Sequence, residues 1–129
     1  MIVLDASLLI GPLHPFDAHH EAATRLLLAA DPGSLLVHAM TLAEVFVGGV
    51  RIGQGAQMQA DLGAAGIILT DRDDNEPLRL AELRASTGLR LPDCCVLDAA
   101  ITNSGTLATF DQALASTAHR LSVPTLPAG

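Results

Sequence analysis

Short apolar runs alternate along the chain with longer stretches in which apolar residues recur at helical spacing. The runs at 2–4, 35–37, 67–69 and 106–108 have the length and composition of buried parallel strands. A further strand is expected at 121–123 or at 125–126, where a sheet edge tolerates Pro124. The pattern therefore predicts a sheet of four or five strands.

Helices are predicted between these strands. Apolar residues at intervals of three and four predict helices over 19–30, 54–65, 77–86, 92–103 and 111–118, and a short one near 8–10. Another helix is expected after Thr41, its cap, with Leu42, Val45, Phe46 and Val50 on its apolar side. Alternating strands and helices predict an α/β fold, a three-layer α/β/α arrangement with a mostly parallel sheet, as one domain over 1–129.

Composition narrows the class of protein. Half of the 129 residues are hydrophobic, with three Phe and no Trp or Tyr, which predicts an aliphatic core. No apolar stretch reaches the roughly 18 residues of a membrane span, and the first residues lack the basic region of a signal peptide, so a cytoplasmic protein is expected. Cys94 and Cys95 are adjacent and are expected to be reduced thiols.

The chain is acidic, with a formal net charge of -7 and seven Arg but no Lys. This charge disfavours a nucleic-acid partner for the bare chain, because a phosphate backbone attracts a basic surface. Bound metal or a basic partner chain would offset part of it.

Two aspartates follow predicted strands. Asp5 comes directly after the first strand, and Asp111 lies three residues after the fourth. Ligands of parallel sheets bind beyond the carboxyl ends of the strands, so both residues are candidates for a site. Turn and cap chemistry explains either Asp equally well when each is taken alone.

The helix that starts at Pro92 carries two further candidates. Asp93 falls on the same side as Val96, Leu97 and Ala100, where a carboxylate needs a partner or a metal. The alternative is an ordinary first-turn acid that the helix dipole favours. Asp98 projects nearer the polar side, and a solvated or locally bonded acid is the better interpretation of it.

Other polar groups give weaker indications. Glu44 lies opposite the apolar arc of its helix and is predicted by periodicity to face solvent. The acids of 71–76 predict a solvated loop and helix start. The histidines have no metal-site spacing, the cysteines lack the C-x-x-C pairing of zinc sites, and phosphate-binding glycine motifs are absent from the sequence. Ser7 has no evident His-and-acid relay.

Four segments, in this order, resemble the motifs of PIN-domain nucleases. They are Ile2-Val3-Leu4-Asp5-Ala6-Ser7, Thr41-Leu42-Ala43-Glu44-Val45, Leu91-Pro92-Asp93 and Leu107-Ala108-Thr109-Phe110-Asp111. The order, the spacing and the chain length are most similar to VapC ribonuclease toxins of type II toxin–antitoxin systems.

The resemblance implies a function that the residues alone do not. It implies a Mg²⁺- or Mn²⁺-dependent endoribonuclease toxin that cleaves RNA and arrests translation. Its metal and catalytic residues would be Asp5, Glu44, Asp93 and Asp111, so here the resemblance overrules periodicity for Glu44. Ser7, Thr109 and Asp98 would support these ligands, and Arg90 is a candidate phosphate contact although a surface Arg is the simpler interpretation.

The resemblance also implies partners. VapC toxins form homodimers and are inhibited by a VapB antitoxin, which binds operator DNA on behalf of the complex, and no membrane is involved. One position departs from the pattern, because Ala113 stands where many members carry a second Asp or Asn.

Two alternatives remain from the sequence. One is a degenerate PIN-like module that only binds partners. The other is a receiver-like signalling domain, which the absence of Lys opposes; Asp5-Ala6-Ser7 likewise lacks the Asp-x-Asp of haloacid-dehalogenase phosphatases.

Overall fold

The computed structural model describes residues 1–127, and five strands and seven helices lie within them. The strands are β1 (Ile2–Leu4), β2 (Leu35–Val37), β3 (Ile68–Leu69), β4 (Thr106–Ala108) and β5 (Thr125–Leu126). The helices are α1 (Ala6–Leu13), α2 (His20–Ala29), α3 (Ala39–Arg51), α4 (Gly55–Ala64), α5 (Glu76–Thr87), α6 (Leu91–Thr102) and α7 (Gln112–Arg120). The predicted positions of the strands are confirmed, with the edge strand at 125–126.

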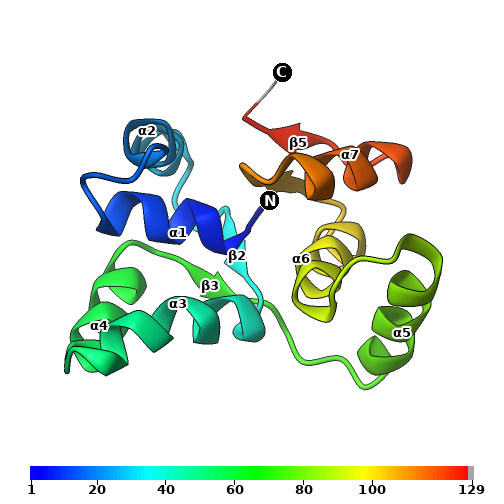
Figure 1. The fold of residues 1–129 in the computed structure, drawn as a ribbon, viewed down its shortest axis with the longest axis horizontal. Coiled ribbons are helices and arrows are strands. Elements are labelled where there is room, and N and C mark those ends of the chain that lie inside the picture. Colours follow the sequence, from blue (N-terminus) through cyan, green and yellow to red (C-terminus); the bar gives the residue numbers. More distant parts are fainter. Residues whose placement is uncertain (128–129) are drawn as a thin grey trace.

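The strands form one sheet in the order β3-β2-β1-β4-β5, and every neighbouring pair is parallel (Figure 1). The prediction of a mostly parallel sheet of four or five strands is therefore confirmed. The chain starts in the middle of this sheet, at β1, and β1 pairs with β2 on one side and β4 on the other.

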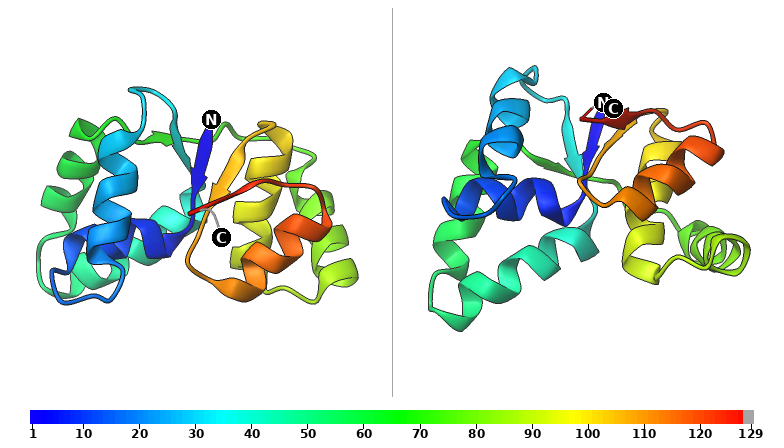
Figure 2. Two further views of the ribbon diagram at one scale, coloured as in Figure 1. Left: turned by 90° about the horizontal axis from the view of Figure 1, so that it is seen from above. Right: turned by 45° about the horizontal axis from the view of Figure 1, so that its top comes forward.

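Helices cover both faces of the sheet, and each face has its own core. Val3, Leu36 and Leu107 face a cluster formed with α6 and α7. Leu4, Val37 and other strand residues face a second cluster formed with α1, α2 and α3. Successive strand residues point to opposite faces, so continuous apolar runs are what a doubly covered sheet requires. The two views of Figure 2 show these helical layers on either side of the strands.

The start of α3 differs from the prediction. The helix begins at Ala39 and its N-cap is His38, whose Nδ1 accepts a hydrogen bond from the Met40 N–H at 3.0 Å. Thr41 is therefore not the cap; it lies in the first turn of the helix and is buried. The buried side of α3 is Thr41, Val45 and Gly49, whereas Val50, which was predicted to be apolar-facing, is 65% exposed.

Within residues 1–127, none of the helices is both long and apolar enough to cross a membrane.

Candidate functional site

The carboxyl ends of β1 and β4 lie side by side, and Asp5 stands at this edge of the sheet. The Asp5 N–H donates to the carbonyl oxygen of Ala108 at 3.0 Å, which ties the two strand ends together. Asp5 is also the N-cap of α1, because its Oδ1 accepts from the Ala6 N–H at 2.8 Å. The capping role that the sequence left open is thus real, and it occupies only one of the two carboxylate oxygens.

Two hydroxyl groups hold the other oxygen. The Oδ2 atom of Asp5 accepts hydrogen bonds from Thr109 Oγ1 at 2.7 Å and from Ser7 Oγ at 3.2 Å. Each hydroxyl also accepts from the backbone of the loop after β4: Ser7 from the Phe110 N–H at 3.3 Å and Thr109 from the Asp111 N–H at 3.0 Å. The Asp5 carboxylate is therefore fixed to the segment that carries Asp111.

Asp93 lies in the first turn of α6, and its side chain is 18% exposed. Burial, followed by the negative charge of Asp5 and with a smaller contribution from Asp111, raises the pKa of Asp93. Arg90 acts in the opposite direction, with its Nε 4.0 Å from Asp93 Oδ2, but it does not cancel the effect. The structure thus brings three aspartates from distant parts of the chain within electrostatic reach of one another.

Asp111 is the N-cap of α7. Its Oδ1 accepts from the Leu114 N–H at 3.1 Å, and the residue is exposed. As at Asp5, the cap leaves one carboxylate oxygen for another contact. Helix capping and a place at the site are therefore compatible for both residues.

Glu44 lies on α3 and is exposed, as its periodicity predicts. Burial raises the pKa of the Cys95 thiol to about 11, and the charge of Glu44 contributes to that shift together with Glu76 and Asp98. Cys95 is two residues beyond Asp93 on α6, so the Glu44 carboxylate lies on the side of α3 that approaches α6. Among residues 1–127 there is no hydrogen bond or ion pair between Glu44 and the three aspartates.

Asp98 does not lie on a polar side of α6. It is only 4% exposed, and Arg79 binds both of its oxygens, Nε to Oδ1 at 2.9 Å and Nη2 to Oδ2 at 3.1 Å. The expectation of a solvated acid was wrong because every residue of 94–100 is buried. The sheet, α5 and other helices surround α6, so one apolar arc does not describe it.

Arg79 also pairs with Asp73, at 2.8 Å between Nη1 and Oδ2. Hydrogen bonds to Asp98 and to Asp73 raise the pKa of Arg79. The ion pair between Arg79 and Asp98 connects α5 to α6, so it stabilises the packing of the two helices. A supporting role of Asp98 at the aspartate site stays a prediction.

Glu76 was predicted to belong to a solvated acidic run, but its side chain is 19% exposed and pairs with His38, a residue for which no role was predicted. His38 directly follows β2, as Asp5 follows β1, and its Nε2 lies 2.5 Å from Glu76 Oε1. A polar residue immediately after a buried strand was the signal available for His38. Nothing in the acidic run marked Glu76 as paired, because its partner is 38 residues away.

Comparison with known families now identifies the chain. Its sequence matches the model of the PIN domain over residues 2–120, which is nearly its whole length. The chain belongs to the PIN-domain family. No curated protein sequence gave a significant match.

Solved structures similar to this PIN domain include toxins and a toxin–antitoxin complex. A toxin–antitoxin complex from Klebsiella pneumoniae is 23% identical, with a TM-score of 0.72 and coverage of 86% of this chain and 87% of that one. VapC20 from Mycobacterium tuberculosis, a sarcin-ricin loop cleaving toxin, is 15% identical, with a TM-score of 0.75 and coverage of 91% and 95%. FitAcB from Neisseria gonorrhoeae is 21% identical, with a TM-score of 0.71 and coverage of 97% and 96%. The TM-scores and coverages of these structures show that the chain has a VapC-like fold.

The residues of this PIN domain suit the metal dependence that is general in the family. Asp5, Asp93 and Asp111 offer oxygen ligands of the kind that Mg²⁺ and Mn²⁺ prefer. Burial raises the pKa of Asp93 most, and the negative charges of Asp5 and Asp111 add to that shift, so the three carboxylates repel one another. A divalent cation would remove that repulsion, so the chemistry of the donor set fits a metal. The ligand atoms of the three aspartates do not all lie within 4.8 Å of one another, so their side chains would draw together around the ion.

Proposed function

We propose that this PIN domain is a Mg²⁺- or Mn²⁺-dependent endoribonuclease, the toxin of a VapBC-type toxin–antitoxin system. The observation that carries the proposal is the convergence of Asp5, Asp93 and Asp111 at one edge of the sheet. They come from the end of β1, the start of α6 and the start of α7. Helix capping or hydration would not require the three carboxylates to lie close together, because each could cap a helix or be hydrated at a separate position.

Asp5, Asp93 and Asp111 would bind the cation directly. When bound, the ion supplies charge neutralisation for the phosphodiester and lowers the pKa of a coordinated water. Glu44, exposed on the facing side of α3, would bind through a water molecule or orient the attacking water.

The remaining residues would position these groups. Ser7 and Thr109 orient the Asp5 carboxylate through their hydrogen bonds to Oδ2. Arg90 is 78% exposed beside Asp93, so its guanidinium can reach a phosphate next to the one that is cleaved. A contact between Arg90 and a phosphate would be important for RNA binding, because the chain has seven Arg and no Lys.

RNA is the proposed substrate. Support comes from the family, whose members are typically nucleases, and from the RNA-loop-cleaving activity of VapC20, which shares the fold. The net charge of -7 is not favourable for binding RNA by the bare chain. Bound metal and arginines such as Arg90 would therefore have to carry much of the contact.

A VapB-like antitoxin is the proposed protein partner. Several neighbours were crystallised as toxin–antitoxin complexes, and some of these with DNA. In this chain α1, α3 and α4 surround a groove of about 340 Å³ whose rim includes exposed Leu13 and Ile52. An apolar antitoxin segment would cover this surface. We further propose a homodimer that meets operator DNA only through the antitoxin.

The test is cleavage of RNA by the purified chain with Mg²⁺ or Mn²⁺, with and without EDTA. Asp5→Asn and Asp93→Asn should remove cleavage while the far-ultraviolet circular dichroism remains that of the wild type. Asp31→Asn, an exposed acid in the loop before β2, is the matched control and should cleave normally. Full activity of both site variants would refute the assigned site.

The alternative is a PIN domain that does not cleave RNA. The observation that favours it is Ala113, which stands where many family members carry a second Asp or Asn. If the wild type binds its antitoxin tightly and cleaves no cellular RNA with either metal, the chain is an interaction module. Mapping RNA 5′ ends after induced expression, with Asp5→Asn as the reference strain, would decide between the two.

A further inference from the structure

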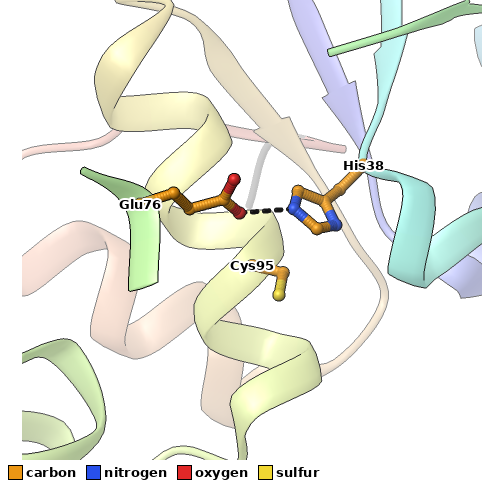
Figure 3. Close-up of side chains that lie close together, drawn as sticks. All are labelled: His38, Glu76 and Cys95. Carbon is orange, nitrogen blue, oxygen red and sulfur yellow. Dashed lines mark hydrogen bonds and ion pairs between the residues drawn. The ribbon is translucent and has the colours of Figure 1, made fainter. Parts of the chain in front are cut away.

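Three side chains of the kinds that bind metals come together outside the aspartate cluster. His38, Glu76 and Cys95 each place one potential ligand atom within 4.8 Å of the others. They come from three elements: the residue after β2, the first residue of α5 and the second turn of α6. Figure 3 shows the His38 ring and the Glu76 carboxylate joined by a hydrogen bond, with the Cys95 sulfur beside them.

The chemistry of this set differs from that of the aspartate site. An imidazole nitrogen, a thiolate sulfur and one carboxylate oxygen are the ligands of Zn²⁺ and similar borderline ions, whereas Mg²⁺ prefers oxygen alone. The absence of C-x-x-C, which had argued against zinc, does not apply to ligands drawn from distant segments.

The three side chains are partly or fully withdrawn from water. Cys95 is 4% exposed, and the side chains of His38 and Glu76 are 17% and 19% exposed. A carboxylate beside a buried thiol attracts a divalent ion, which in turn stabilises the thiolate. His38 and Glu76 also line a cavity of about 490 Å³, so two of the three side chains can be reached from it.

We propose that His38, Glu76 and Cys95 bind one Zn²⁺-type ion at a site separate from the Asp5, Asp93 and Asp111 cluster. The nitrogen and oxygen are 2.5 Å apart, closer than the roughly 3.3 Å between two such ligands on a tetrahedral ion. The ion therefore takes the place of the proton that His38 Nε2 donates to Glu76, and the two side chains separate slightly. A water completes the coordination.

Binding has a consequence at the start of α3. The Met40 N–H donates to Nδ1 of His38, so in the metal-free protein the imidazole proton is on Nε2, which donates to Glu76. A metal on Nε2 moves that proton to Nδ1, and the thiol proton of Cys95 passes to solvent. Nδ1 then no longer accepts from Met40, so metal binding and helix capping by His38 exclude each other.

The experiment is a titration of the metal-free full chain with Co²⁺, a spectroscopic substitute for Zn²⁺. A thiolate-to-cobalt charge-transfer band should rise to one equivalent, and Zn²⁺ should displace it. Cys95→Ser should abolish the band, while Cys94→Ser, which removes the adjacent buried thiol, should retain it. His38→Asn keeps a capping side chain but removes the nitrogen ligand, and should weaken binding by at least about 100-fold.

Two further measurements make the result specific. Zn²⁺ should shift the Met40 amide signal in the nuclear magnetic resonance spectrum, and Asp5→Asn should leave the cobalt band intact. The proposal is overturned by a wild type without the band, by a band unchanged in Cys95→Ser, or by its loss in Asp5→Asn. Because none of these readouts involves RNA cleavage, failure here is distinct from failure of the nuclease proposal.

Discussion

Thr109→Val removes one oxygen atom that connects two of the proposed metal ligands. In the structure this hydroxyl donates to Asp5 Oδ2 at 2.7 Å and accepts from the Asp111 N–H at 3.0 Å. Thr109 is only 5% exposed, so water does not readily replace either bond. Valine keeps the volume of the side chain and its preference for extended backbone, so the change acts almost entirely through the lost hydrogen bonds.

The magnitude follows from those two bonds. A hydrogen bond to a carboxylate contributes about 1.5–3 kcal/mol and a neutral one about 0.5–1.5 kcal/mol. Asp5 keeps its bond from Ser7 and is half-buried, which places the expected loss near the lower limit, about 2 kcal/mol. Loss of a group that orients a metal ligand also costs roughly 10- to 100-fold in metal affinity.

The assay is urea unfolding in EDTA, combined with Mn²⁺ binding by calorimetry. Thr109→Ser is the matched control: it loses a methyl group and about 1 kcal/mol, but it retains the hydroxyl and should bind Mn²⁺ as the wild type does. If Thr109→Val binds Mn²⁺ with unchanged affinity, the inference that Thr109 orients Asp5 for a metal is refuted. Equal stability of Thr109→Val and the wild type would refute the energetic argument.

Three other predictions follow from the same structure. The raised pKa of Asp93 means that the native state binds the carboxyl proton more tightly than the unfolded chain does. Without metal, the free energy of unfolding of the wild type should therefore rise relative to that of Asp93→Asn as pH falls through this pKa. In urea unfolding, the difference between the two proteins should become smaller at lower pH. A Cβ at Gly49 would lie 1.8 Å from Met58 Sδ, so the flexible Met58 side chain must move in Gly49→Ala, whereas Gly48→Ala meets open space on the same helix. In thermal melts Gly48→Ala should stabilise by roughly 0.5–1 kcal/mol, and Gly49→Ala should be the less stable of the two variants. Arg90→Gln should raise KM for RNA severalfold and leave Mn²⁺ affinity within about twofold, and unchanged KM would remove Arg90 from the substrate contact.

The sheet could be predicted from sequence because strands covered on both faces are continuously apolar. Val3 and Leu4 point into different cores, and both cores exclude water, so the run from 2 to 4 has no polar position. The ends of these runs then located Asp5 and the segment of Thr109 and Asp111 at the correct edge. That Asp93 lies near Asp5 and Asp111 depends on the arrangement of the helices and strands. The family resemblance implied this arrangement, whereas the residues alone did not.

One error arose because helical projection assumes that a helix has a single apolar side. For α6 this assumption fails because the whole stretch 94–100 is buried, so Asp98 lies inside with Arg79 as its partner. At α3 the cap is a histidine rather than the nearby threonine, because the strand ends at Val37 and the helix starts at once. Pairs such as Asp98 with Arg79 are formed between helices, and local sequence patterns do not specify them.

Divalent-metal binding by the aspartate cluster is the claim on which the functional account depends, and calorimetric titration with Mn²⁺ measures it most directly. The titration is best made in a Cys95→Ser background, which removes the second proposed site. We predict that Asp5→Asn, Asp93→Asn and Asp111→Asn each weaken binding by at least about tenfold, and that Asp31→Asn does not. Equal Mn²⁺ affinity in all five proteins would contradict the account.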